Sequence, residues 1–329
     1  MQRFVAALPG FRIGADENGL GPRLGPMIVT AVLAEVNEEG HRLVGRPARG
    51  KLAELLGDSK ALLAHGNIAL GEAWARCLVE RGAGVSRHAA TTEDLVRAFS
   101  IDSDDVLKRR CPDHAKAQCW STHGEGFIAE TGTMRAIHKA LDTLELKGVR
   151  VLSVRSGIVC TDALNEAARQ GRSRFHVDLH TMERLILDMR EGVEGDVLAV
   201  CGKVGGIGRY LTAFGPLAGR LSTTLVEKRH ESAYYFPGIG ELRFLVDADA
   251  SDRLVGLSSL VGKWLREVLM GRITRHYRAH DDTLPDASGY HDPITEQFVQ
   301  ATRLVRKKRA HPDDCFERLS LGGLDAARR

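Results

Sequence analysis

The sequence predicts a layered α/β domain. Runs typical of strands alternate along the chain with segments whose apolar residues recur at helical spacing. The 329 residues are 43% hydrophobic and 27% charged, which is an ordinary globular composition that can bury a sizeable core. Because aromatic residues make up only 5%, this core must rely on Leu, Val, Ile and Ala. The composition excludes disordered, collagen-like and disulfide-framework proteins.

The first half of the chain contains two expected strands followed by helical segments. Residues 11–15 and 27–36 read as strands joined by a Gly/Pro-rich loop. Residues 68–78 have apolar positions at helical spacing. Residues 90–126 are polar, and an amphipathic helix is expected over 127–144.

The second half continues this alternation. Strands are expected over 149–154, 197–201 and 242–246. Helices are expected over 174–190 and 257–273, because their apolar residues fall on one side. Helical segments dominate the last part of the sequence.

Four regions are expected along the chain. Residues 1–89 and 149–280 form the two parts of the core, because they hold the strand-like runs. The polar segment 90–148 reads as an insertion or subdomain between them. Residues 281–329 form a helical C-terminal region.

The cysteine content indicates the cellular compartment of the protein, whereas the net charge says little about its binding partner. The 46 Lys and Arg against 43 Asp and Glu give a net charge of +3, which decides little about binding. The six cysteines are scattered, as expected of free thiols in a reducing compartment. No apolar run reaches membrane-spanning length, and the first residues lack the apolar stretch of a signal peptide. We therefore expect a cytoplasmic protein that does not enter a membrane.

One group of potential zinc ligands lies in the polar segment. Cys111, His114, Cys119 and His123 fall within 13 residues, and Pro112 indicates a loop. Structural zinc sites usually show two tight ligand pairs, which this group lacks. Coincidence in a loop is therefore the favoured interpretation.

The most informative stretch contains two adjacent acids, Asp16 and Glu17. Adjacent side chains in a strand face opposite sides of the sheet, so we expect the chain to leave strand geometry at Glu17 if both serve one centre. Gly19 and Gly21 supply a permissive backbone for that turn, and they let main-chain amides approach a phosphate or sugar. A polar turn joining two strands is the alternative interpretation.

Residues 16–26 read Asp-Glu-x-Gly-x-Gly-Pro-x-x-Gly-Pro, which resembles the opening motif of type 2 ribonucleases H. Further blocks resemble that family in the same order. The Asp-Ser-Lys-Ala-Leu run at 58–62 is similar to its second motif, and Asp249 followed by 257–266 is similar to its third. Gly289-Tyr290 resembles the Gly-Tyr pair that supplies a sugar-stacking tyrosine.

The resemblance implies a ribonuclease H-like mixed sheet flanked by helices, with acids gathered at its centre. It implies metal-dependent hydrolysis of RNA in RNA–DNA hybrids or at ribonucleotides embedded in duplex DNA. Asp16, Glu17 and Asp249 would be the catalytic metal ligands, and their hard oxygens suit Mg²⁺ or Mn²⁺. The acids Asp247 and Asp252 leave open a shift of register around Asp249, and a solvated strand-end acid is the alternative.

Substrate-binding roles follow for six residues: Gly19, Gly21, Lys60, Lys203, Lys263 and Tyr290. Lys60 and Lys263 would balance negative charge at the site, or else form ordinary surface ion pairs. Lys203 opens a glycine-rich loop whose amides would hold the nucleic-acid backbone, or else it lies in a plain turn. Tyr290 would stack on the sugar beside the scissile phosphate.

The chain also departs from the family pattern. The family has a further aspartate at the end of the strand over 197–201, and here that position falls on Cys201 or Gly202. Asp196 is at the wrong end of this strand, and cysteine is a soft ligand that suits Mg²⁺ poorly. The family's Gly-Arg-Gly element is Gly-Leu-Gly at 19–21, which loses a charged phosphate contact.

These departures leave two main hypotheses. One is an active endoribonuclease of this type, and the other is a catalytically impaired or inactive protein that binds hybrids or other nucleic acids on the same fold. A nuclease with another substrate is a third possibility, because the 2′-OH is what separates RNA from DNA. No feature of the sequence indicates an oligomeric state.

Overall fold

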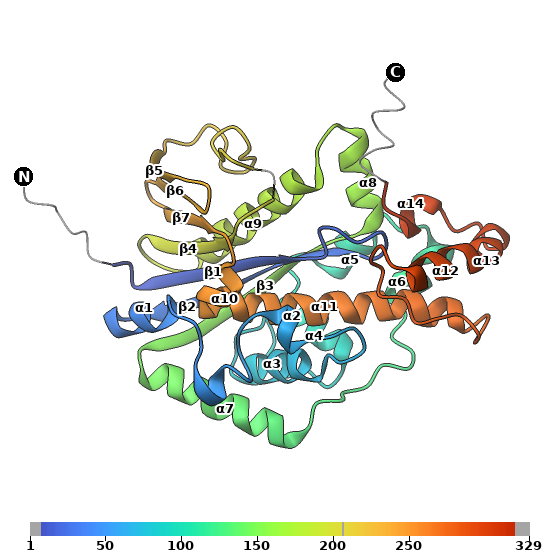
Figure 1. Cartoon of the computed structure of the whole chain (residues 1–329), viewed down its shortest axis with the longest axis horizontal. Helices are drawn as coiled ribbons and strands as arrows, with labels where there is room; N and C mark the ends of the chain where they lie inside the picture. Colours follow the sequence, from blue (N-terminus) through green and yellow to red (C-terminus); the bar gives the residue numbers. More distant parts are fainter. Residues whose placement is uncertain (1–7, 206, 320–329) are drawn as a thin grey trace, which may run out of the picture.

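The computed structural model describes residues 8–205 and 207–319 (Figure 1). Within this part, seven strands form one sheet in the order β3-β2-β1-β4-β7-β6-β5. Its strands are β1 (Phe11–Asn18), β2 (Met27–Val36), β3 (Val149–Val159), β4 (Val197–Gly202), β5 (Thr223–Glu227), β6 (Glu231–Phe236) and β7 (Gly240–Leu245). β1 is parallel to β4 and β4 to β7, whereas the other neighbours are antiparallel. The expected mixed sheet is confirmed.

Helices cover both faces of the sheet. They are α1 (Glu38–Val44), α2 (Ser59–Leu62), α3 (Ala69–Glu80), α4 (Thr92–Phe99), α5 (Asp104–Lys108), α6 (Lys116–Trp120), α7 (Thr131–Leu146), α8 (Thr161–Arg169), α9 (Arg174–Glu191), α10 (Ala248–Ser251), α11 (Arg253–Arg278), α12 (Pro293–Ala301), α13 (Arg303–Lys308) and α14 (Asp313–Phe316), with short 3₁₀ turns at Gly50–Leu52 and Asp113–Ala115. In Figure 1, α9 lies above the central strands and α11 below them. Beyond α11, α3 and α7 add a further layer.

Each face of the sheet has its own hydrophobic core. On the α11 face, Ile28 and Val32 of β2 pack with Leu257 and Val261 of α11. A Cβ at Gly14 of β1 would overlap the backbone of α11, so the glycine permits this close packing. On the α9 face, the core joins alternate residues of β1 and β4 to Leu179, Met182, Leu185 and Ile186 of α9.

The first strand is longer than the sequence predicted. β1 continues past Ala15 to Asn18, and Asp16 and Glu17 pair with Thr30 and Val29 of β2. The expectation that the chain leaves strand geometry at Glu17 is therefore wrong, because the ladder with β2 extends through both acids. The turn begins at Gly19, whose φ of +93° lies in the left-handed region that favours glycine.

The other expected elements are present with shifted bounds. The helix expected over 127–144 begins only at Thr131, since the amides of Ile128 and Ala129 donate to the Glu72 carboxylate in extended chain. The segment expected as an insertion contributes Phe99 of α4 and Ile137 of α7 to the core under α11. The division of the chain into four regions stays a prediction. No helix in the described ranges is long and apolar enough to cross a bilayer.

Candidate active site

A cavity of about 520 Å³ opens at the carboxyl ends of the parallel strands β1, β4 and β7. Such ends meet at one edge of a sheet, where α/β proteins commonly bind ligands. All nine residues singled out in the sequence line this cavity: Asp16, Glu17, Gly19, Gly21, Lys60, Lys203, Asp249, Lys263 and Tyr290. The structure thus brings together residues that span most of the chain.

Asp16 lies on the α11 face of β1, partly buried beside Ser259 of α11. Burial raises the pKa of its carboxyl to about 8, and the nearby charges of Glu17 and Asp249 act in the same direction. A hydrogen bond from Ser259 opposes this rise in pKa only in part. Asp16 is therefore a carboxylate held among other acids in a poorly solvated position.

Glu17 projects toward the opposite, α9 face, because side chains alternate along β1. Its Oε2 accepts a hydrogen bond of 3.0 Å from the amide of Leu20, which fixes it to the start of the glycine loop. Burial raises the pKa of this carboxyl, and the Lys60, Arg318 and Arg266 charges counteract the rise. Both acids reach the cavity because they stand at the last positions of the strand.

Asp249 is the third acid of the cavity and stands in the first turn of α10. Burial and the nearby Asp58 raise its pKa. Asp252 is excluded from the site, since it caps α11 by accepting from the amides of Leu254 and Val255 and forms an ion pair with Arg12. The register centred on Asp249 therefore fits the cavity; Asp247 also lines it, exposed and with a left-handed φ of 52°.

The two lysines expected to balance charge are placed differently. Lys60 is exposed at the cavity, and its charge acts on both Glu17 and Asp249. Lys263 donates from Nζ to the carbonyl oxygens of Ser59, at 3.0 Å, and Leu63, so it ties α11 to α2. Among the described residues neither lysine is in a salt bridge, so the alternative of a surface ion pair does not hold.

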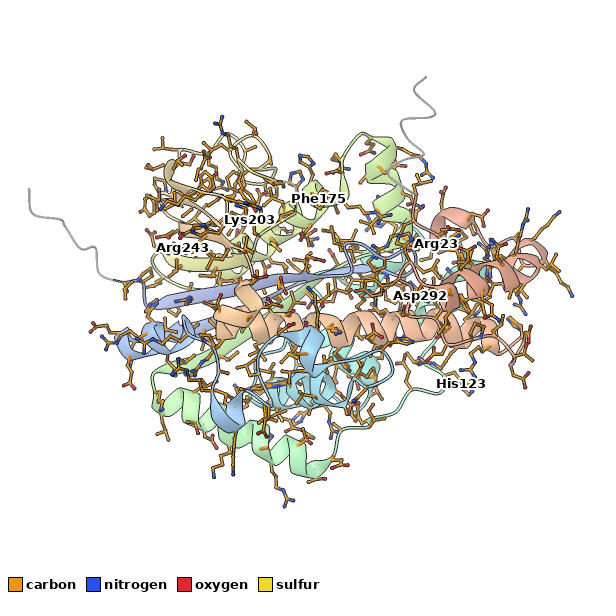
Figure 2. All side chains as sticks on the ribbon, in the orientation of Figure 1. Arg23, His123, Phe175, Lys203, Arg243 and Asp292 are labelled. Carbon is orange, nitrogen blue, oxygen red and sulfur yellow. The ribbon has the colours of Figure 1, made fainter. Side chains whose placement is uncertain are left out.

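Lys203 follows β4 and holds the loop after this strand to the β5–β6 turn. Its Nζ donates to the carbonyl oxygens of Lys228, at 3.0 Å, and Arg229, at 2.9 Å. Figure 2 shows Lys203 close to Phe175 at the start of α9, and a Cβ at Gly205 would lie 3.0 Å from that phenyl ring. The loop therefore covers one side of the cavity, next to the N-terminal end of α9.

Two arginines contact the glycine loop after β1, and the sequence analysis gave neither of them a role in the site. A Cβ at Gly19 would lie 2.8 Å from the Arg266 side chain, so only glycine fits here. Arg318 donates to the carbonyl of Gly19 at 2.6 Å and to that of Gly25 at 2.7 and 2.9 Å. Around Gly21 there is open space, which leaves its backbone accessible to a ligand.

Tyr290 is exposed over the cavity. Its side chain is 45% accessible, and the Arg266 guanidinium lies 4.5 Å from the ring centroid. The carbonyl of Gly289 accepts from the amides of Arg23 and Leu24 at 2.8 and 3.0 Å, which joins this segment to the glycine loop. One face of the ring is thus supported by a cation, as in an aromatic platform for a ligand.

The end of β4 supplies no acid. Cys201 is buried in the α9-side core, where burial raises the pKa of its thiol. Gly202 stands beside Asp16 on the α11 face, and a Cβ there would come within 2.5 Å of Asp16 Oδ1. The position expected to hold an aspartate is therefore occupied by a buried thiol and by a glycine against which Asp16 packs.

The three acids fit a divalent cation. Their oxygens are hard ligands, they face one cavity, and burial raises the pKa of each; nearby carboxylates also raise the pKa of Asp16 and Asp249. No arginine, lysine or histidine is among the main charges acting on Asp16. A cation would compensate this excess of negative charge, which is the chemistry that Mg²⁺ and Mn²⁺ share.

Two of the possible zinc ligands in the polar segment make other contacts. His114 Nε2 lies 2.9 Å from the carbonyl oxygen of Ala310, and Cys111 Sγ accepts from Trp120 Nε1 at 3.4 Å. Figure 2 shows His123 on the side of the molecule away from Lys203. That these four residues fall together in a loop by coincidence stays a prediction.

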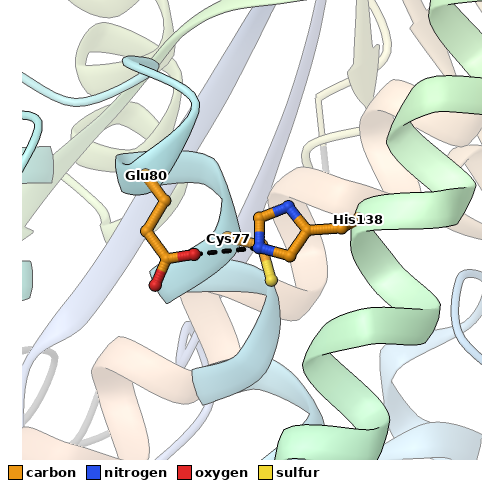
Figure 3. Close-up of side chains that lie close together, drawn as sticks. All are labelled: Cys77, Glu80 and His138. Atoms are coloured by element: carbon orange, nitrogen blue, oxygen red, sulfur yellow. Dashed lines mark hydrogen bonds and ion pairs between the residues drawn. The ribbon is translucent and has the colours of Figure 1, made fainter.

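Among residues 8–205 and 207–319, one group of three possible ligands has atoms that all lie within 4.8 Å of one another; it is not the three acids of the cavity but Cys77, Glu80 and His138, between α3 and α7 (Figure 3). Glu80 Oε2 lies 2.9 Å from His138 Nε2, and the Cys77 thiol donates to the Met134 carbonyl. The Arg81 guanidinium contacts the same imidazole at 3.5 Å. Hydrogen bonds satisfy these groups, and the adjacent positive charge opposes a cation.

Comparison with known proteins finds no matching family model and no matching curated sequence. Solved structures do match. RNase HII from Archaeoglobus fulgidus, solved with PCNA, has 14% identity and a TM-score of 0.42 over 94% of this chain and 95% of that one. Bst-RNase HIII with Mn²⁺ has 12% identity and a TM-score of 0.43 over 99% and 70%.

Ribonuclease H2 from Pyrococcus horikoshii OT3 has 11% identity and a TM-score of 0.42 over 93% of this chain and 92% of that one. The mixed sheet with its flanking helices is the architecture that the sequence predicted. In this comparison the chain is similar in fold to ribonucleases HII, HIII and H2. What the cavity does has to follow from its own residues.

Proposed function

We propose that this protein is a metal-dependent endoribonuclease that hydrolyses RNA in RNA–DNA hybrids or at ribonucleotides embedded in duplex DNA. The observation that carries the proposal is the meeting of Asp16, Glu17 and Asp249 in one cavity, beside the glycine loop and Tyr290. The free cysteines in the described chain agree with a cytoplasmic setting.

Asp16, Glu17 and Asp249 would hold Mg²⁺ or Mn²⁺. When bound, these ions supply activation of a water nucleophile and stabilisation of the leaving oxygen. The backbone at Gly21 is open to a phosphate or sugar, because nothing lies within 4 Å of a Cβ there. Lys60 adds a positive charge at the cavity for a phosphate that the acids would otherwise repel.

Selection of RNA would depend on contacts to the ribose. Tyr290 offers an exposed ring over the cavity, and its opposite face is supported by Arg266. A ring in this position can stack on the sugar next to the scissile phosphate, where the 2′-OH distinguishes RNA from DNA.

A second candidate is a protein that binds hybrids or other nucleic acids without cleaving them. The observation that favours it is the end of β4, where Cys201 and Gly202 supply no carboxylate. A site with fewer acids neutralises two divalent ions less completely, so catalysis would be weaker or lost.

The test is cleavage of a labelled RNA–DNA hybrid, and of a duplex with one ribonucleotide, in Mg²⁺ and in Mn²⁺. Asp16→Asn removes a charged ligand and keeps the shape, so cleavage should fall by about 10² or more with folding intact. The matched control is Asp142→Asn. Asp142 is an exposed acid of α7 that is paired with Arg81, and this variant should cleave normally.

Retained cleavage by Asp16→Asn would contradict the assignment of the metal centre. Binding of the hybrid that is equal in EDTA and Mg²⁺, with no cleavage by the wild type, would favour the binding protein. Equal cleavage of an all-DNA duplex would point to a nuclease of a different specificity.

A further inference from the structure

Asp178 of α9 is a buried acid without a partner. Its side chain is 0% exposed, and neither carboxylate oxygen has a hydrogen-bond partner in the described part of the chain. Buried polar groups are nearly always hydrogen-bonded, and burying an unpaired carboxylate is strongly unfavourable. Something other than packing has to account for this residue.

Asp178 stands next to the acids of the cavity. Burial raises the pKa of Asp178 well above its ordinary value, and the neighbouring charges of Glu17 and Asp16 act in the same direction. Glu17 projects toward α9 from β1, and Asp178 lies in the second turn of α9, close to the end that meets the glycine loop. Asp178 is fully buried and does not line the cavity, so it lies in the interior near Glu17 and not at the cavity surface.

A second buried acid on α9 has the hydrogen bonds expected of a carboxylate with a structural role. Glu183 is also 0% exposed, but its oxygens accept from the amide of Gly215 at 3.1 Å and from that of Leu217 at 2.8 Å. Its negative charge is thus shared with backbone dipoles. Asp178 has none of these contacts, although it is just as deeply buried.

The position of Asp178 matches the place where β4 lacks an acid. Cys201 faces the α9-side core, and Asp178 is the first of the charges that act on its thiol. The two side chains are therefore neighbours that approach Glu17 from different elements. An acid on α9 can replace, in charge, one that is missing from β4.

We propose that Asp178 is the fourth acidic group of the site and acts as a positioning residue, whose buried, unpartnered carboxyl group near Glu17 strengthens the binding of a divalent cation there. This inference rests on the proposed function. A cation at Glu17 would compensate two acids at once, and neither oxygen of Asp178 has another partner in the described part of the chain.

The test is binding of Mn²⁺ alone to the full chain, followed by electron paramagnetic resonance of free Mn²⁺, with thermal unfolding in EDTA as the second readout. Asp178→Asn should weaken Mn²⁺ binding about 10- to 100-fold, as for groups that support metal ligands. Its unfolding temperature in EDTA should equal or exceed that of the wild type, because an uncompensated buried charge is removed.

The decisive variant places an acid on β4 in place of the one on α9. Asp178→Asn combined with Cys201→Asp should recover Mn²⁺ affinity, since the two side chains face the same core. Glu183→Gln is the matched control: it should lower the unfolding temperature in EDTA, because backbone amides lose a charged acceptor, and leave Mn²⁺ affinity unchanged.

Wild-type Mn²⁺ affinity in Asp178→Asn would overturn this inference and leave the proposed function standing. A loss of affinity that Cys201→Asp does not recover would also overturn it, because the role would then be structural. Absence of Mn²⁺ binding by the wild type would overturn the proposed function itself, and the inference with it.

Discussion

Two groups of buried charged residues in this protein differ in how far positive and negative side chains are paired within them. Under α11, the fully buried Arg272 pairs with Glu93 at 2.9 Å and with Glu125 at 2.5 Å, and Glu125 also pairs with Arg275 at 2.6 Å. At the end of the sheet, only other acids are among the charges that act on Asp16 and Asp178, whereas three positive side chains act on the neighbouring Glu17.

This difference separates two uses of buried charge. In the Arg272 group, opposite charges of the chain itself are paired, and these pairs join the segment around Glu125 to α11. The acids at β1 are incomplete without something positive from outside. An unbalanced group of this kind destabilises a protein, so its presence indicates a site that acts on a ligand.

The largest effect is expected from breaking the balanced group. Glu125→Gln removes the acid shared by Arg272 and Arg275 and should lower the free energy of unfolding by about 3 kcal/mol. Urea unfolding in EDTA measures this change. Mn²⁺ affinity should stay at the wild-type value, and a parallel loss of affinity would show that the two groups are coupled.

A smaller effect is expected when a divalent cation binds to the acids at the end of β1. Mn²⁺ at a hundred times its dissociation constant should stabilise the wild type by about 2.7 kcal/mol. Thermal unfolding across a Mn²⁺ series measures it. Asp16→Asn should show little of this stabilisation, and an equal shift in both proteins would mean that Mn²⁺ binds elsewhere.

Tyr290→Ala removes an aromatic ring that lies over an ion pair. Arg266, beneath the ring, is paired with Glu267 at 2.8 Å. The substitution should reduce discrimination between ribose and deoxyribose by about 1–3 kcal/mol, the usual size of a stacking contribution. Ratios of cleavage rates for matched substrates measure it. Tyr290→Phe keeps the ring and should keep the preference; unfolding should be nearly unaffected in both variants.

The smallest effect concerns His65, which lies 2.7 Å from Glu267 and 3.6 Å from Asp286. Hydrogen bonds to these two acids raise the pKa of His65 to about 10. The resulting stability is fully present below the unfolded pKa of about 6.5 and is lost as pH rises through about 10.

Because His65 is partly exposed, we expect less than about 1 kcal/mol from it. The free energy of unfolding of the wild type and of His65→Gln, measured by urea at several pH values, should differ at pH 6 and converge toward pH 10. A difference that grows with pH would contradict the assignment.

Which nearby residues of the candidate site lie together could be predicted from the sequence. Asp16, Glu17, Gly19 and Gly21 lie within six residues, so one motif is enough to place them together. The parallel order of β1, β4 and β7 then brings Lys203 and Asp249 to the same edge. The chain did not need to leave strand geometry at Glu17, because at the last residues of a strand both faces open onto the same cavity.

The remaining parts depend on contacts that leave no local signal. Asp178 is one polar residue on an amphipathic helix, and nothing in its neighbours' spacing shows that it points inward at the acids of β1. Arg318 reaches Gly19 across 299 positions of sequence, and a lone arginine near other charged residues looks like surface. Such residues become visible only once burial and partners are known.

The hold of Arg318 on the glycine loop has a consequence for the order of events during synthesis. The acids of β1 are made long before Arg318, and the carbonyl of Gly19 receives its donor only when residue 318 has been made. At about 5–20 residues per second, roughly 300 residues separate these moments by about 15–60 s. During that interval the nascent chain holds its acids beside a glycine loop that lacks this support, so the loop is completed only after synthesis has passed residue 318.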